Sequence, residues 1–286
     1  MLVQIGPLRE DALMGVAAIW RYPIKAMLGE LLEDVEIGPR GCEGDRRWIV
    51  VDAASGERIA NKRGPTDPRL RACRAELLDA GDQHPPLRVT LPDASRIEGA
   101  EIEAALSELL ERRVRLERSD TPADGRFVTT GAFHDLAPIH LITTGTLAHL
   151  RAIAPGSDWD VRRFRPNLLL DNGPDAEAFD EDALLGSGLE APSGLELSVG
   201  LPTPRCVVPT RAQDGLPADP GILRTLVERH RIDLGPFGRL GCAGAYAEIA
   251  SAGRLRTGDR LEVRRGDMAP RAAIDSAVTR LQESGA

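Results

Sequence analysis

The sequence predicts a β-rich α+β fold, in which a β-barrel carries a few appended helices. The chain has 286 residues, and its 29 glycines and 21 prolines separate short apolar runs along most of its length. Short runs between turns are typical of strands, and many such strands with few helices favour a barrel. Hydrophobic residues make up 42% of the chain but aromatic residues only 3%. The core must therefore be built from Leu, Val, Ile and Ala.

Six apolar runs are predicted to be strands. The clearest is Arg47 to Asp52, which a turn at 53–56 follows, and the turn at Gly258 and Asp259 leads into the last of them. Each run has the length and the flanking turn residues expected of a strand. The six runs are 47–52, 87–91, 139–143, 167–171, 195–199 and 260–264.

Three segments are predicted to be helical. Apolar residues recur at helical spacing over 100–112 and over 147–153. Asp219 followed by Pro220 is typical of an N-cap and a first-turn proline, and an apolar stripe continues after them. Residues 1–13 are expected to be a loose lead-in, 119–126 a polar linker, and the last twenty residues a polar or helical tail.

The charge and the cysteines exclude several classes of protein. The net charge of −8 disfavours nonspecific binding to nucleic acid or to an anionic membrane. The sequence has no apolar run near 18 residues and no secretory leader, so we expect a cytoplasmic protein without a membrane segment. The four widely spaced cysteines form no C-x-x-C pair, which argues against a zinc knuckle, a thioredoxin-like motif or a disulfide framework.

Cys206 lies in a segment that is rich in proline and follows an arginine directly. Residues 202–210 read P-T-P-R-C-V-V-P-T, directly after a predicted strand. Prolines hold a loop in place, and the charge of Arg205 favours the thiolate of Cys206, which is a soft metal ligand and a nucleophile. A buried structural cysteine is the more common fate of a single Cys, and composition alone favours that reading.

Basic residues recur in two further motifs that suggest an anion site. Lys25 ends Y-P-I-K, and Arg46 lies in G-D-R-R-W, where Asp45 either orients it or caps a turn. Arg162, Arg163 and Arg165 precede Asn167 in R-R-F-R-P-N. Singly, each cation is more often a solvated surface charge with carboxylate partners.

Taken together and in order, these motifs resemble the MOSC superfamily, specifically the proteins with an N-terminal MOSC β-domain, such as the mitochondrial amidoxime-reducing component and its bacterial counterparts. The similarity runs from about residue 16 to about residue 263 and includes a closing G-x-L-R-x-G-D motif. It implies a MOSC-type β-barrel core with appended helices and an N-terminal β-domain. The expected division is an N-terminal domain at 14–118, a MOSC domain at 119–267 and a tail at 268–286.

The resemblance also implies a molybdenum cofactor, a molybdenum–molybdopterin, with Cys206 as the protein ligand of the metal and as the catalytic residue. Further residues are implied to contact the cofactor: Lys25 and Arg46 on its phosphate, Arg165 and Asn167 on the pterin or phosphate, Arg205 and Thr210 beside the metal, and Asp135 and Thr143 as additional polar contacts. Two departures are visible. Ala26 stands where the family often has serine, and residues 134–138 lack the hydroxyl groups of the family pattern.

The implied reaction is the reduction of small N-oxygenated compounds. Since the sequence shows no cysteine-rich ferredoxin-like extension, electrons are expected from a separate ferredoxin, flavodoxin or cytochrome b5-like protein with its reductase. Two alternatives stay open: a sulfur carrier that holds a persulfide on Cys206, and a pterin-binding scaffold without turnover.

Overall fold

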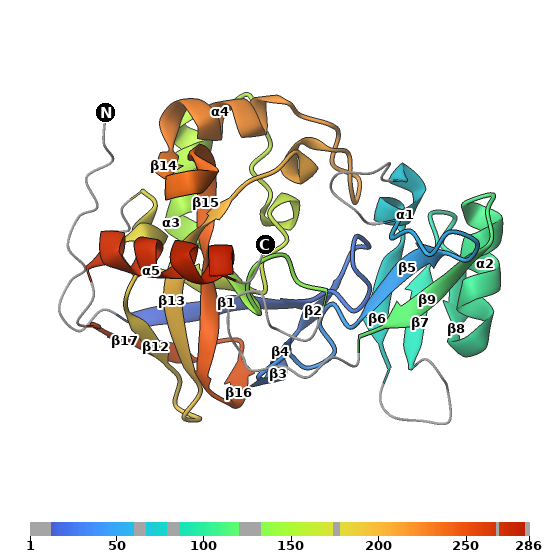
Figure 1. Cartoon of the computed structure of the whole chain (residues 1–286), viewed down its shortest axis with the longest axis horizontal. Coiled ribbons are helices and arrows are strands. Elements are labelled where there is room, and N and C mark those ends of the chain that lie inside the picture. Colours follow the sequence, from blue (N-terminus) through green and yellow to red (C-terminus); the bar gives the residue numbers. More distant parts are fainter. Residues whose placement is uncertain are drawn as a thin grey trace.

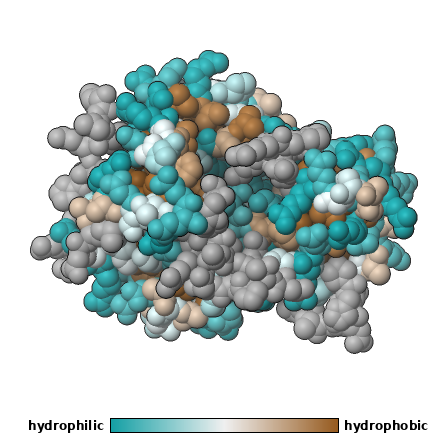
Figure 2. All heavy atoms as spheres, in the orientation of Figure 1, coloured by the Kyte–Doolittle hydropathy of each residue, from teal (hydrophilic) through white to brown (hydrophobic). Residues whose placement is uncertain are grey.

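The computed structural model of the chain describes residues 13–59, 67–78, 86–119, 133–173, 178–266 and 269–283. Nearly all of the expected lead-in and linker lie outside these ranges. Within them, no helix has the length and apolar character needed to cross a membrane. Figure 2 shows one face of the molecule, on which hydrophilic side chains dominate and hydrophobic ones form scattered patches.

A seven-stranded barrel forms the larger part of the described structure (Figure 1). The sheet closes because its two end strands, β10 and β15, pair antiparallel, with Ile139 opposite Ala247. In order around the barrel, the strands are β10 (Ile139–Thr143), β11 (Leu168–Asp171), β1 (Leu13–Arg21), β17 (Arg260–Arg264), β12 (Gly188–Glu190), β13 (Glu196–Pro204) and β15 (Arg239–Ser251). Two short strands extend it, β2 (Glu30–Leu32) on β1 and β14 (Arg231–Asp233) on β15.

Aliphatic side chains fill the barrel, as the composition predicts. Val16, Leu141, Leu170, Val199 and Leu261 are at most 2% exposed and belong to one apolar cluster. A second cluster lies between the barrel and two helices, α3 (Thr144–Ile153) and α4 (Gly221–Arg229). Strand β10 is buried along its whole length because it contributes to both clusters.

A smaller lobe, which we call the N-terminal lobe, lies to the right of the barrel in Figure 1. Its own apolar core includes Val50, Leu70, Val89 and Leu106. The elements of the lobe are β5 (Trp48–Asp52), α1 (Pro68–Ala72), β6 (Arg74–Leu77), β7 (Leu87–Thr90), β8 (Arg96–Glu98), α2 (Ile102–Leu109) and β9 (Val114–Arg118). A further small sheet joins β3 (Asp34–Gly38) to β4 (Gly41–Cys42) and β16 (Gly253–Arg256).

The predicted fold class is confirmed, and each of the six predicted strands corresponds to an observed one. Two local predictions need correction. The lead-in ends earlier than expected, because β1 begins at Leu13 and pairs with β17 there. Helix α4 begins at Gly221, with Pro220 as its N-cap, although the Asp219 carboxylate still accepts a hydrogen bond from the Gly221 N–H.

The tail is helical and belongs to the core. Helix α5 (Pro270–Glu283) packs against β13, and its buried residues recur at helical spacing: Ala273, Ile274, Ala277, Val278 and Leu281. Its outer face is polar, which explains why the sequence alone suggested a polar segment.

The substitution Ile274→Ala tests this packing. Ile274 is 2% exposed, so the change removes buried apolar volume and should lower the free energy of unfolding by about 2–5 kcal/mol. Gln282→Ala, on the exposed face of the same helix, should change it by less than about 0.5 kcal/mol. Chemical denaturation measures both, and equal effects would contradict the packing of α5.

Candidate functional site

A pocket lies where the barrel meets the N-terminal lobe. Its wall includes Tyr246 and His140 from barrel strands, Leu70 from α1 in the lobe, and Cys206 from the loop that follows β13. The lining also includes six cationic side chains and two carboxylates. The cations are Lys25, Arg46, Arg71, Arg165, Arg205 and Arg211, and the carboxylates are Asp67 and Asp135. A protein with a net charge of −8 therefore concentrates positive charge in this pocket.

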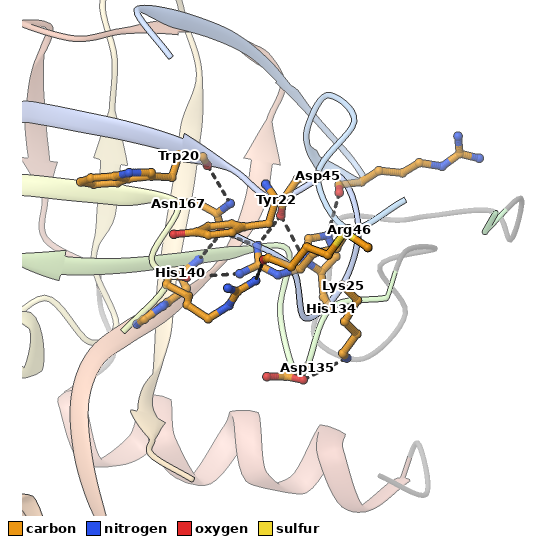
Figure 3. A network of polar contacts seen from close by, with 12 residues as sticks. Trp20, Tyr22, Lys25, Asp45, Arg46, His134, Asp135, His140 and Asn167 are labelled. Carbon is orange, nitrogen blue, oxygen red and sulfur yellow. Dashed lines mark hydrogen bonds and ion pairs between the residues drawn. The ribbon is translucent and has the colours of Figure 1, made fainter. Parts of the chain in front are cut away.

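A buried carboxylate orients the first of these arginines. Asp45 is 0% exposed, forms an ion pair with Arg46, and accepts a hydrogen bond of 2.7 Å from the Tyr22 N–H (Figure 3). Arg46 also donates to the Asn167 side-chain oxygen at 3.3 Å and to the Arg165 carbonyl at 3.2 Å. Segments far apart in the sequence thus meet around one guanidinium group.

The Tyr22 ring supports two cations. The guanidinium carbons of Arg165 and Arg46 lie over it, 4.4 and 4.7 Å from its centroid. Burial raises the pKa of Tyr22 to about 12, although the charges of Arg165 and Arg46 oppose the shift. Burial lowers the pKa of Arg165 to about 10, partly offset by Tyr22. At neutral pH the phenol is therefore uncharged, and Arg165 keeps its positive charge.

Three residues of the pocket wall have a left-handed backbone. The φ angles of Ala26, Arg46 and Arg165 are 74°, 50° and 53°. Such a conformation costs a non-glycine residue on the order of 1–3 kcal/mol and persists where the surroundings enforce it. This conformation recurs at three positions around one pocket. The surrounding structure therefore holds the backbone of the site in a conformation that these residues do not favour on their own.

Cys206 lies beside an arginine with spare donor capacity. Arg205 donates to the Phe164 carbonyl at 2.8 Å and lies 3.3 Å from His140 Nε2, while its buried Nε has no hydrogen-bond partner. Burial and the neighbouring arginines lower the pKa of His140 well below its usual value, so His140 is neutral and accepts from Arg205. Cys206 is half-buried, follows Arg205 directly in the chain and lines the same pocket.

Two protein-family models match the chain. The model for the MOSC N-terminal beta barrel domain matches residues 13–130, and the model for the MOSC domain matches residues 129–262. The chain belongs to the MOSC superfamily. MOSC domains are associated with binding of the molybdenum cofactor.

A comparison with curated proteins finds no match. Similar solved structures include the YuaD protein from Bacillus subtilis, with 13% identity, 90% of this chain and 99% of that chain covered, and a TM-score of 0.47. YiiM from Geobacillus stearothermophilus shares 14% identity over 51% of this chain and 64% of its own, with a TM-score of 0.33. Likeness at this level carries no argument about function.

Seven of the nine predicted site residues of this MOSC protein line the pocket: Lys25, Arg46, Asp135, Arg165, Asn167, Arg205 and Cys206. Two of them engage each other, since Lys25 donates to Asp135 at 3.1 Å. Asn167 is 1% exposed, and its amide contacts the Trp20 carbonyl, the His140 N–H and Arg46. Asn167 therefore positions Arg46, and its direct contact with a cofactor stays a prediction.

Thr143 and Thr210 are not among the residues that line the described pocket, and their contact with a cofactor stays a prediction. Thr143 is 0% exposed and caps α3, accepting a hydrogen bond from the Thr146 N–H. Thr210 donates its hydroxyl to the Val207 carbonyl in a short 3-10 turn. Each hydroxyl group stabilises the nearby backbone, Thr143 at the start of α3 and Thr210 in the turn after Cys206. The sequence motifs gave no sign of these local hydrogen bonds.

The arginine run at 162–165 divides into three roles. Arg165 alone of the three lines the pocket. Arg162 pairs with Asp160 and Asp214, as expected for a solvated charge with carboxylate partners. Arg163 is 0% exposed and donates to the carbonyls of Asp158, Pro209 and Pro217.

Sequence reasoning missed Arg71, Arg211 and Gln213. Arg211 and Gln213 follow Cys206 closely, and this proximity was the available signal. Arg71 lies in α1 within no recognisable motif. The other three cysteines, Cys42, Cys73 and Cys242, are all buried with free thiols, as is typical of structural cysteines.

The residues present fit an anionic, oxygen-rich cofactor with a metal. Arg205 Nε is a buried donor without a hydrogen-bond partner, Lys25, Arg46 and Arg165 bring positive charge to the pocket wall, and Cys206 supplies one thiol. Among the described residues, no three His, Cys, Asp or Glu side chains group as a metal cage. The described part of the chain thus offers a single thiolate ligand beside donors for an anion.

His134, which lies beside Asp45, should make the free energy of unfolding depend on pH. Burial lowers the pKa of His134 to about 4, although Asp45 opposes the shift, and its ring contacts the Arg40 carbonyl at 3.0 Å. Because the unfolded chain binds this proton more readily, unfolding takes up a proton between pH 6.5 and about 4. Stability should therefore fall as the pH falls through this window.

His134→Gln removes that dependence. Between pH 6.5 and 4, wild type should lose on the order of 3 kcal/mol relative to the variant, measured by denaturation at several pH values. His149→Gln, at a half-buried position, serves as the control. Parallel pH profiles for wild type and His134→Gln would show that this histidine titrates normally.

Proposed function

We propose that this protein binds a molybdenum–pterin cofactor through Cys206 and reduces small N-oxygenated compounds with electrons from a separate redox protein. The observation that carries the proposal is that the half-buried Cys206 lines a cation-rich pocket and directly follows Arg205, whose buried Nε has no hydrogen-bond partner. The association of MOSC domains with this cofactor supports it.

The chain's own residues account for binding and orientation. Lys25, Arg46 and Arg165 present positive charge to the anionic part of the cofactor, and their donors are directional. Asp45 and Tyr22 hold Arg46 in place, so little rotational freedom is lost on binding. The loop from Pro204 to Pro209 keeps the thiolate sulfur fixed relative to these cations.

The cofactor, when bound, supplies two-electron chemistry and removal of an oxygen atom. The overall reaction balances as R–NH–OH plus two electrons and two protons giving R–NH2 and water. Since the pocket lies between the barrel and the N-terminal lobe, its walls exclude bulk water from the bound compound. Apolar wall residues such as Ile59, Leu70 and Phe164 suit the carbon skeleton of a small substrate.

Cys206→Ala tests the ligand role. Molybdenum bound per chain, measured by mass spectrometry of the metal, should fall by about tenfold or more, because even outer-sphere partners change metal affinity 10–100-fold. Reduction of an N-hydroxylated compound with an artificial electron donor should fall in parallel.

Cys73→Ala is the matched control, because Cys73 is buried in the core of the N-terminal lobe. It should keep both the metal and the activity. Full metal content and full activity in Cys206→Ala would refute the ligand role.

A second candidate function is sulfur transfer. Cys206 is the half-exposed thiol, whereas the chain's other three thiols are buried. A persulfide donor R–S–S⁻ would transfer its outer sulfur to the Cys206 thiolate and leave as R–S⁻, so one S–S bond breaks and one forms.

Intact-mass analysis after incubation with a persulfide donor separates the two functions. The reductase proposal predicts molybdenum on the purified protein and no stable sulfur on Cys206. A gain of one sulfur atom that is lost in Cys206→Ala, together with no molybdenum, would favour the carrier.

A further inference from the structure

A second group of polar side chains lines the same pocket and takes no part in the cofactor contacts assigned above. Arg71 comes from α1 in the N-terminal lobe, and Arg211 and Gln213 come from the loop that follows Cys206. The two segments are neighbours, since Asp214 in the loop forms an ion pair of 2.9 Å with Arg74 just after α1. Figure 1 shows α1 beside the orange segment that contains this loop.

Two guanidinium groups of this set, Arg71 and Arg211, line one pocket and come from neighbouring segments. Burial lowers the pKa of Arg71, and the positive charge of Arg211 lowers it further. The Asp67 carboxylate opposes this shift, and it also accepts hydrogen bonds from the Arg69 backbone N–H and guanidinium. Two like charges held together at a pocket wall are stabilised by an anion between them.

Gln213 adds a directional donor to this group. It is 6% exposed, it lines the pocket, and its side-chain Nε2 has no hydrogen-bond partner. A buried amide without a partner costs about 1–3 kcal/mol, a cost that an oxyanion ligand would remove.

The loop that carries Arg211 and Gln213 is rigidly held. The buried Arg163 donates to the carbonyls of Pro209 and Pro217, at 3.3 and 3.0 Å, and so clamps both ends of the loop. Gln213 and Leu216 exchange backbone hydrogen bonds of 2.8 and 3.0 Å across its tip. The geometry of the donors is therefore set before any ligand arrives.

These cations form a group separate from the cofactor grip. Arg71 comes from α1 and Arg211 from the loop after Cys206, whereas Arg46 and Arg165 lie together over the Tyr22 ring. The pocket wall thus carries two groups of cations that come from different segments.

We propose that Arg71, Arg211 and Gln213 bind the carboxylate of the substrate, so that the protein selects N-oxygenated compounds that carry an acidic group. This assignment rests on the reductase function proposed above. A planar carboxylate accepts hydrogen bonds from two guanidinium groups and an amide at once. Apolar residues of the same pocket wall, such as Leu70, Val207 and Val208, suit the carbon skeleton.

The test compares two rigid compounds, a benzamidoxime with a para carboxylate and its uncharged para carboxamide. Titration calorimetry on the purified holoprotein, without an electron donor, measures binding alone. Wild type should bind the carboxylate about tenfold more tightly, since charged hydrogen bonds contribute more than neutral ones. Arg71→Gln and Arg211→Gln should each abolish most of that preference, and Gln213→Ala should reduce it.

Arg224→Gln is the matched control, because it removes the same charge from the exposed face of α4. It should leave the preference intact. Melting temperature and molybdenum content, measured on every variant, should match wild type.

Equal binding of the two compounds by wild type would overturn the proposal, and so would a preference that survives in both arginine variants. Loss of molybdenum from these variants would assign the subsite to the cofactor instead of the substrate. Because calorimetry needs no turnover, failure of the reductase function would appear separately, as full metal and activity in Cys206→Ala.

Discussion

The ion pair between Asp45 and Arg46 is the constraint on which the pocket depends. Asp45 is fully buried, and its carboxylate accepts from the Tyr22 N–H while it holds the Arg46 guanidinium. A buried charge without its partner is strongly unfavourable, so neither side chain moves independently. Through Arg46 the pair also fixes Asn167 and the Arg165 carbonyl. Three stretches of sequence are thereby joined at the wall of one pocket.

This constraint explains how an acidic protein maintains a cationic pocket. Mutual repulsion between Arg46 and Arg165 is offset by the Asp45 carboxylate and by the face of the Tyr22 ring. A recessed cluster of one sign focuses the electrostatic field and attracts ligands of the opposite sign. The negative net charge elsewhere keeps nonspecific anions such as nucleic acid away. The pocket therefore favours small anionic ligands.

The sequence predicted the fold class and seven residues of the pocket wall because both leave local signals. Short apolar runs between turns revealed the strands, and the ordered motifs around Lys25, Arg46, Asn167 and Cys206 revealed the wall. Asp45 was expected either to orient Arg46 or to cap a turn, and the structure shows that it orients Arg46. Residues that are far apart in the sequence and come together only in the folded chain left no local signal of this kind. Arg71 and Arg211 come to one pocket only when the lobe packs on the barrel, and Thr143 caps α3, which begins three residues before the predicted helix at 147–153.

The central claim is that the Cys206 sulfur is bonded to the metal. X-ray absorption at the molybdenum edge counts sulfur neighbours directly, and it applies to a Cys206→Ser variant that retains part of its cofactor. The account predicts one sulfur neighbour fewer around molybdenum in the variant than in wild type. An unchanged number of sulfur neighbours would contradict it.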